Sequence, residues 1–333
     1  MRYRELLFSS ARRSGSLFCL GIDPVVEWFP RELRGDGIKT ADGIEPSAVG
    51  RVVDLLEVAL SAFDSIGAPP AAFKPNIGYF VRYDRPRAGE FAGSRALASI
   101  LEILRDRAPE TPIILDAKRG DIARSSANYA AEAFDVWGVD AVTVSPWMGD
   151  DSVEPFLARA AEYGGIYLLA RTSNPGARRF QNLILPEGDP VYRRVLDAAI
   201  TWDRGSTAVG AAGVVLGATA PAELRDALTR LLTDPVPVLI PGVGGQGGSA
   251  EEVLRIVVET DYPPELVRVN ASSGALFPWA RRNAGGNTGA EGGENADAGR
   301  ADWRQEIARS VTALHRSLAF KPAAAGGNEG IAE

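Results

Sequence analysis

Hydrophobic residues along the chain gather in short continuous runs, each of which ends in a polar residue, a glycine or a proline. Eight runs rich in Val, Ile and Leu occupy residues 17–24, 71–79, 112–120, 140–146, 165–173, 213–219, 236–244 and 266–272. Continuous rather than alternating apolar positions are typical of parallel strands that are buried on both faces. The pattern therefore predicts eight strands of a parallel sheet.

Segments with helical periodicity lie between these runs. Apolar residues recur at three- and four-residue spacing in segments such as 47–63, 96–107, 153–163 and 250–260. Eight strand–helix units predict an α/β fold of the (β/α)8 TIM barrel type in a single domain, which usually needs about 250 residues plus insertions. The alternative is a doubly wound sheet, which usually has fewer strands.

The remaining length divides by composition. We expect the barrel core to occupy residues 1–282 and a flexible insertion rich in Gly, Asn and Ala to occupy 283–300. Residues 301–321 then predict a C-terminal helix that packs on the barrel, and 322–333 a disordered tail.

Composition excludes several kinds of chemistry. With one histidine and one cysteine among 333 residues, the chain has no Cys/His zinc site, disulfide framework or paired redox cysteines. The net charge of −7 argues against a general nucleic-acid partner. The N-terminus lacks a signal-peptide core, and no apolar stretch is long enough for a membrane span. We therefore expect a cytoplasmic protein with no membrane or nucleic-acid partner.

Charged residues collect where the second and third predicted strands end. Asp116 and Lys118 are two residues apart on one strand, so they are expected to point to the same side of the sheet. Lys74 ends the preceding strand, and Asp121 opens the following loop. An alternating row of these four charges would stay ionised near neutral pH, which suits a fixed electric field and a lysine proton donor better than general base catalysis. Ordinary solvated ion pairs are the alternative.

A glycine-rich loop follows the seventh predicted strand. It contains Pro241, Gly244, Gln246 and Gly247 and leads into a helix. Backbone amides of such a loop and the helix N-terminus favour a phosphate group, and the loops after strands seven and eight commonly bind phosphate in these barrels. A tight strand–helix turn is the alternative.

Five motifs together carry a family resemblance. They are CLGIDP at 19–24, AFKPNIGYF at 72–80, LDAKRGDI at 115–122, ARTSNPGA at 170–177 and PGVGGQGG at 241–248. Over roughly residues 15–282 the chain resembles orotidine 5′-phosphate decarboxylase of the bacterial type 2 branch. The resemblance implies conversion of orotidine 5′-monophosphate to UMP and CO₂, the last step of de novo pyrimidine biosynthesis. It also implies a homodimer with shared active sites, no metal and no organic cofactor.

The resemblance also implies roles for the charged row. Lys118 matches the lysine that protonates C6 of the pyrimidine, and Asp116 the carboxylate beside the departing carboxylate. Lys74 completes the row, while Asp121 and Ile122 match residues supplied to the active site of the partner subunit.

The remaining matches concern substrate binding. Asp23 matches a ribose contact, and Ser145 a contact to the pyrimidine ring. Gln246 and the loop around it, including Pro241, Gly244 and Gly247, match the phosphate site. Ser125 stands where the family has a threonine and preserves its hydroxyl.

One departure concerns phosphate binding. Relatives commonly carry an arginine after strand eight, where this chain has Ser273. Arg281 or Arg282 is a candidate replacement. The departure puts phosphate affinity in doubt more than the chemistry.

Two other functions remain open at this stage. A related Mg²⁺-dependent decarboxylase of sugar phosphates such as 3-keto-L-gulonate 6-phosphate shares the DxKxxD pattern, but the resemblance implies an acidic residue where Lys74 stands. A non-catalytic nucleotide-binding barrel is the second alternative, and its only support is the missing arginine.

Overall fold

The computed structural model describes residues 2–34, 46–161, 164–206, 210–280 and 302–321. Within them, eight parallel strands form one sheet in the order β2-β1-β10-β9-β8-β7-β6-β5. Their bounds are Phe18–Ile22 (β1), Ala72–Pro75 (β2), Ile114–Arg119 (β5), Ala141–Val144 (β6), Gly165–Arg171 (β7), Ala212–Leu216 (β8), Val238–Ile240 (β9) and Val267–Ala271 (β10).

The sheet closes into a barrel. Its two edge strands, β2 and β5, are joined by parallel bridges between Phe73 and Ile113 and between Asn76 and Asp116. The predicted (β/α)8 barrel is therefore confirmed, and the doubly wound alternative is wrong, because a doubly wound sheet stays open at its edges.

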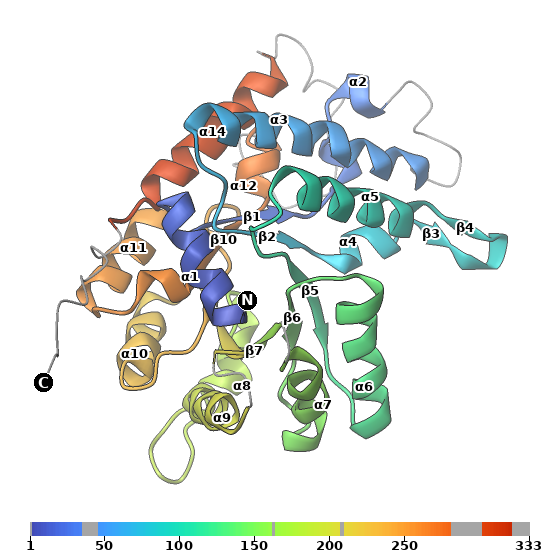
Figure 1. The fold of residues 1–333 in the computed structure, drawn as a ribbon. Coiled ribbons are helices and arrows are strands. Elements are labelled where there is room, and N and C mark those ends of the chain that lie inside the picture. The colour runs from blue at the N-terminus through green and yellow to red at the C-terminus, as the bar shows by residue number, and fades with distance from the viewer. Residues whose placement is uncertain (1, 35–45, 162–163, 207–209, 281–301, 322–333) are drawn as a thin grey trace, which may run out of the picture.

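Helices surround the barrel, as Figure 1 shows. The longer ones are α1 (Tyr3–Ser14), α3 (Val52–Ile66), α5 (Ala92–Arg107), α6 (Ala123–Ala131), α7 (Asp150–Ala160), α9 (Val191–Gly205), α10 (Pro221–Leu231), α11 (Ala250–Glu259) and α14 (Trp303–Ser317). Short helices occupy the connections: α2 (Arg31–Arg34), α4 (Ile77–Val81), α8 (Arg178–Gln181) and α12 (Ser273–Leu276). None of the helices in the described ranges is long and apolar enough to cross a membrane.

Two local features depart from the predicted elements. The helix expected from residue 47 begins instead as a 3₁₀ segment, Pro46–Arg51, before α3. Gly50 lies in that segment, and glycine disfavours an α-helix interior. A small hairpin of β3 (Asp84–Arg85) and β4 (Glu90–Phe91) between α4 and α5 was not predicted, because two-residue strands leave no periodic signal.

Helix α1 closes the end of the barrel at which the strands begin. The Tyr3 hydroxyl donates to the Tyr167 hydroxyl on β7 at 3.0 Å, and the Leu7 carbonyl accepts from the Arg268 guanidinium on β10. Arg268 is fully buried and also donates to the carbonyls of Ala71 and Glu265. The buried Arg268 guanidinium thus ties α1 to the barrel through backbone carbonyls. Because α1 covers this end, the opposite end is left for a site.

The C-terminal helix α14 packs against α3 and α12. His315 is buried on this helix, edge-on to the Phe63 ring of α3 with ring centroids 6.0 Å apart. The predicted insertion at 283–300 and tail at 322–333 lie outside the described residues.

The seal made by α1 predicts a sensitive glycine. A Cβ added at Gly165 on β7 would lie 2.2 Å from the ring of Tyr3. We expect Gly165→Ala to displace this ring and lower the free energy of unfolding by about 1–3 kcal/mol, as overpacking of a core does. Thermal or urea unfolding measures the change.

Gly205→Ala at the end of α9 is the matched control. No atom lies within 4 Å of its added Cβ, so its stability should be unchanged or slightly raised. Equal stability of the two variants would contradict the packing role of α1.

Candidate active site

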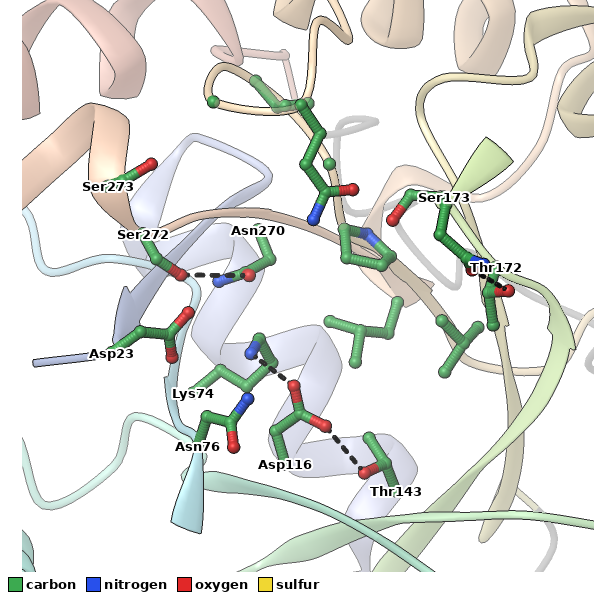
Figure 2. A pocket seen from close by; sticks show the side chains of 18 of the residues that line it. Asp23, Lys74, Asn76, Asp116, Thr143, Thr172, Ser173, Asn270, Ser272 and Ser273 are labelled. Carbon is green, nitrogen blue, oxygen red and sulfur yellow. Dashed lines mark hydrogen bonds and ion pairs between the residues drawn. The ribbon is translucent and has the colours of Figure 1, made fainter. Parts of the chain in front are cut away.

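A cavity of about 710 Å³ opens at the carboxyl ends of the strands. This volume lies within the range of about 300–1,000 Å³ that is usual for small-molecule sites. Figure 2 shows the side chains of Asp23, Lys74 and Asp116 gathered in it, with Thr172 and Ser173 on the other side. The loops after β1, β2, β7, β9 and β10 contribute to its wall, and β5 contributes Asp116 and Lys118 from the strand itself.

Asp116 lies at the centre of the charged residues. The ammonium of Lys74 donates to its Oδ2 at 2.8 Å, and the ammonium of Lys118 donates to its Oδ1 at 2.5 Å. The hydroxyl of Thr143 on β6 donates to Oδ1 at 3.0 Å (Figure 2). The structure therefore brings together three of the four charges that were predicted to form a row. The Thr143 hydroxyl that also donates to Asp116 was not predicted.

The electrostatics keep Asp116 and Lys74 ionised. Burial by itself would raise the pKa of Asp116, but the ammonium groups of Lys74 and Lys118 outweigh it and lower that pKa well below its usual value. Burial alone would lower the pKa of Lys74, yet the carboxylates of Asp116 and Asp23 raise it above its ordinary value. Because both oxygens of Asp116 accept hydrogen bonds from ammonium groups, this carboxylate is unsuited to act as a base.

Lys118 reaches Asp116 from an irregular strand. Simple alternation predicted a regular strand here, but β5 has a register shift between Leu115 and Arg119, and Lys118 has a φ of +47°. Half of the Lys118 side chain is exposed, whereas Lys74 is buried. Lys118 is therefore the cation of the cluster that is most accessible from the cavity.

Six predicted residues are not part of the cavity wall of this chain: Gly244 and Gly247 of the glycine-rich loop, and four that follow β5 and β6. Asp121 accepts from the amide of Ile122 at 2.8 Å rather than joining the lysines, and Ile122 is 50% exposed. Ser125 is exposed in the first turn of α6. Ser145 uses its amide to donate to the Arg119 carbonyl at 2.7 Å. Within a single chain, the structure does not bring these residues to the charged cluster.

The glycine-rich loop lies across one side of the cavity. Pro241 and Gln246 line it, as does Gly245, which was not singled out. Gly244 and Gly247 have positive φ angles and direct their amides to carbonyls inside the loop, Gly244 to Gly248 and Gly247 to Gly244, each at 2.9 Å. These two glycines therefore shape the loop rather than offering their amides to a ligand.

Ser273, which stands where relatives carry an arginine, lies next to the glycine-rich loop. It lines the cavity, and its hydroxyl lies 2.5 Å from where a Cβ on Gly245 would stand. Arg281 and Arg282, the candidate replacements for an arginine here, lie outside the described residues.

Asp23 lies beside Lys74 and Ser272 at the edge of the charged cluster (Figure 2). Burial raises its pKa, although Lys74 and a hydrogen bond from Ser272 oppose the shift. Its Oδ1 is buried with no hydrogen-bond partner in the described chain, and the residue itself lines the cavity.

Several polar residues on the wall were missed as individual site residues. On β7 and the loop that follows, Thr172 donates its amide to Gln181 at 2.8 Å and its hydroxyl to Asn174 at 2.7 Å. Ser173 lines the cavity beside them. The ARTSNPGA motif contains these residues at the carboxyl end of a predicted strand, but no role was assigned to them. These side chains give the wall opposite Asp23 a hydrogen-bonding surface.

The donor set of the cluster is poor for a divalent cation. The described residues include no group of three or more His, Cys, Asp or Glu side chains placed to hold a metal ion. Asp116 is already bound to two ammonium groups, which would repel a cation.

Known proteins share both the sequence and the fold. A relative from Bordetella pertussis, named orotidine 5′-phosphate decarboxylase, is 40% identical over 318 residues, covering 96% of this chain and 98% of its own length. One of the same name from Paracidovorax citrulli is 39% identical over 281 residues, covering 83% and 90%. The solved structure of Leishmania donovani OMP decarboxylase matches with a TM-score of 0.63 and 25% identity, covering 95% of this chain and 99% of that one.

A model of a whole protein family also matches most of this chain. The model of the orotidine 5′-phosphate decarboxylase / HUMPS family matches residues 17–262, which include β1 to β9 and the entire Lys74–Asp116–Lys118 cluster. With this match and relatives that are nearly 40% identical along most of the chain, the protein belongs to the orotidine 5′-phosphate decarboxylase / HUMPS family.

Proposed function

We propose that this protein decarboxylates orotidine 5′-monophosphate to UMP and CO₂ in pyrimidine biosynthesis. The observation that carries the proposal is the Asp116 carboxylate held between the ammonium groups of Lys74 and Lys118 at the wall of a nucleotide-sized cavity. The relatives that share this part of the chain are named for the same reaction.

The chemical step needs a proton donor beside a developing negative charge. When the bond between C6 and the carboxylate breaks, CO₂ leaves and the electron pair stays on C6. The Lys118 ammonium then gives a proton to C6, and the resulting amine regains a proton from solvent. Because that ammonium is already fixed by Asp116, it stabilises the charge on C6 more than it stabilises the ground state.

The other groups bind and orient the substrate. Asp116 faces the departing carboxylate, and binding energy from the distant phosphate holds the two together. Asp23, which lines the cavity, accepts from a ribose hydroxyl. The contact of Ser145 to the pyrimidine ring stays a prediction.

The charged cluster also separates the two alternatives. A Mg²⁺-dependent sugar-phosphate decarboxylase needs an acidic group where Lys74 binds Asp116. A non-catalytic nucleotide-binding barrel has no use for a costly buried carboxylate and lysine. Both are therefore disfavoured.

Replacing the proton donor tests the reaction directly. Lys118→Ala should reduce turnover of orotidine 5′-monophosphate by at least about 10⁴-fold, because proton transfer and charge stabilisation are both lost. UMP affinity should remain within about tenfold, since that ammonium is one contact among many. The fall in ultraviolet absorbance of the substrate measures turnover, and calorimetry measures UMP binding. Turnover by Lys118→Ala at the parent rate would refute the mechanism.

Removing metals tests the cofactor-free mechanism. We expect the parent protein to keep full turnover after dialysis against EDTA, because the proposed step uses only side chains. Loss of activity with EDTA and its return with Mg²⁺ would instead favour the sugar-phosphate alternative.

The phosphate site is proposed at the glycine-rich side of the cavity. Gln246, the Gly245 backbone and the hydroxyl of Ser273 line that side, where an anion would meet hydrogen-bond donors. Pro241 lies at the base of the same loop.

Gln246→Ala should separate phosphate binding from recognition of the nucleoside. We expect UMP affinity to fall about tenfold, as for loss of one hydrogen bond to a charged group, and uridine affinity to stay unchanged. Calorimetry with the two ligands measures this difference. An equal loss for both ligands would place Gln246 elsewhere in the site.

We further propose a homodimer in which Asp121 and Ile122 enter the partner's site. A partner is supported by exposed apolar side chains that follow β6 and β7, namely Trp147 (73% exposed), Met148 (50%) and Phe180 (55%). The ring centroids of Trp147 and Phe180 lie 6.5 Å apart. Contiguous apolar surface of this kind marks interaction sites.

Subunit mixing tests the shared site. Lys118→Ala and Asp121→Asn should each be nearly inactive alone. Mixed in equal amounts and allowed to exchange, half of the dimers would carry one intact site, so about a quarter of the parent activity should return. If no activity returned although mass spectrometry detected mixed dimers, the proposed sharing would be wrong.

A further inference from the structure

Lys118 has a backbone conformation that a lysine seldom adopts. Its φ of +47° lies in the left-handed region, and within the described ranges only Ala123 and Asp261 share this among non-glycine residues. Such conformations are costly and persist only where the surroundings hold them. The residues that hold Lys118 therefore control where its ammonium points.

Thr143 holds the residue from inside the barrel. Its Oγ1 accepts from the amides of Ala117 at 3.0 Å and Lys118 at 2.9 Å, and it donates to Asp116 Oδ1 at 3.0 Å. A hydroxyl has one hydrogen to donate and two lone pairs, so this one is fully used. Thr143 is also 99% buried by neighbouring groups, being 1% exposed, so water does not substitute for it.

Arg119 holds the next residue from outside the barrel. Its guanidinium makes a two-pronged ion pair with Glu132, at 3.1 Å from Nε to Oε2 and 2.8 Å from Nη2 to Oε1. It also lies over the Tyr129 ring, 4.9 Å from the centroid. Glu132 begins a π-helical turn, Glu132–Val136, at the end of α6, and such turns frequently occur at functional sites.

We propose that Thr143 and the Arg119–Glu132 pair are positioning residues that hold the strained backbone of Lys118 and thereby aim its ammonium group into the cavity. The proposal rests on the proposed function, because the aim of that group matters for proton delivery to C6. Arg119 and Glu132 are not among the described residues that line the cavity, and the Thr143 hydroxyl is taken up by Asp116 and two amides, so all three act through Lys118. Without Thr143, the amides of Ala117 and Lys118 lose their acceptor, and the backbone relaxes toward negative φ. The ammonium then leaves Asp116.

The first test compares Thr143→Val with Thr143→Ser. Valine keeps the shape and removes the hydroxyl, so kcat should fall about 100-fold, as when a reacting group is misplaced by about 1 Å. UMP affinity should change by less than about threefold, because the loss concerns only the chemical step. Serine keeps the hydroxyl and should restore kcat to within about fivefold of the parent.

The second test weakens the outer contact. Glu132→Gln keeps the shape and removes the charge, so kcat should fall about fivefold with UMP affinity unchanged, in keeping with a partly exposed ion pair.

Two control variants elsewhere in the protein make the same chemical changes as Thr143→Val and Glu132→Gln. Thr260→Val removes a buried hydroxyl that donates to Ile256 at 2.8 Å, and Asp197→Asn weakens a two-pronged pair with Arg230, both contacts being 2.7 Å. Both controls should lower the melting temperature by as much as their counterparts while leaving kcat unchanged. A merely structural role of Thr143 would give it the same behaviour as Thr260.

A crystal structure of Thr143→Val gives a readout that does not depend on activity. The proposal expects Lys118 at negative φ with its ammonium away from Asp116. A retained positive φ with the ion pair intact, a kcat within twofold of the parent, or a Thr143→Ser as slow as Thr143→Val would overturn it. If the parent itself fails to turn over orotidine 5′-monophosphate, the proposed function is refuted, and the crystal structure still decides the positioning role.

Discussion

The Asp116 carboxylate, shared by two lysines, is the interaction on which the site depends. A buried carboxylate is costly unless it is paired and hydrogen-bonded, and Asp116 meets this condition only because Lys74 and Thr143 come from neighbouring strands. Lys74 lies on β2 and Asp116 on β5, the two strands whose bridges close the barrel. Barrel closure and assembly of the charged cluster are therefore one event: a sheet left open at this seam would separate lysine from carboxylate.

The two ends of the barrel handle buried charge in different ways. At the end sealed by α1, Arg268 is satisfied by backbone carbonyls, with no carboxylate hydrogen-bonded to it in the described chain. At the open end, charges of both signs face one another, with Lys74 and Lys118 against Asp116 and Asp23. Opposed charges give a strong local field without a large net charge. The phosphate site proposed above lies at the glycine-rich side, away from these carboxylates.

How far the sequence predicts this protein depends on what each signal measures. Apolar runs report burial, so the eight strands and the barrel were predictable, and the order of strands was enough to bring Lys74 beside Asp116. Backbone dihedrals leave no such pattern. The conformation of Lys118 depends on a hydroxyl 25 residues further along the chain. Asp121 illustrates a second limit, because its direction in one chain does not reveal a role that would need another subunit.

The pKa shifts show why the field of the cluster is constant near neutrality. Asp116 stabilises the fold while ionised, so its contribution is present above its unfolded pKa and disappears only as pH falls through the lowered folded value. For Lys74 the contribution is present below its unfolded pKa and is lost as pH rises through the raised folded value. Asp23 behaves oppositely to Asp116: its pKa is raised by burial, so folding favours its protonated form. On acidification Asp23 therefore takes up a proton before Asp116. The negative charge of Asp23 is lost first, while the charges of Asp116 and Lys74 remain in place.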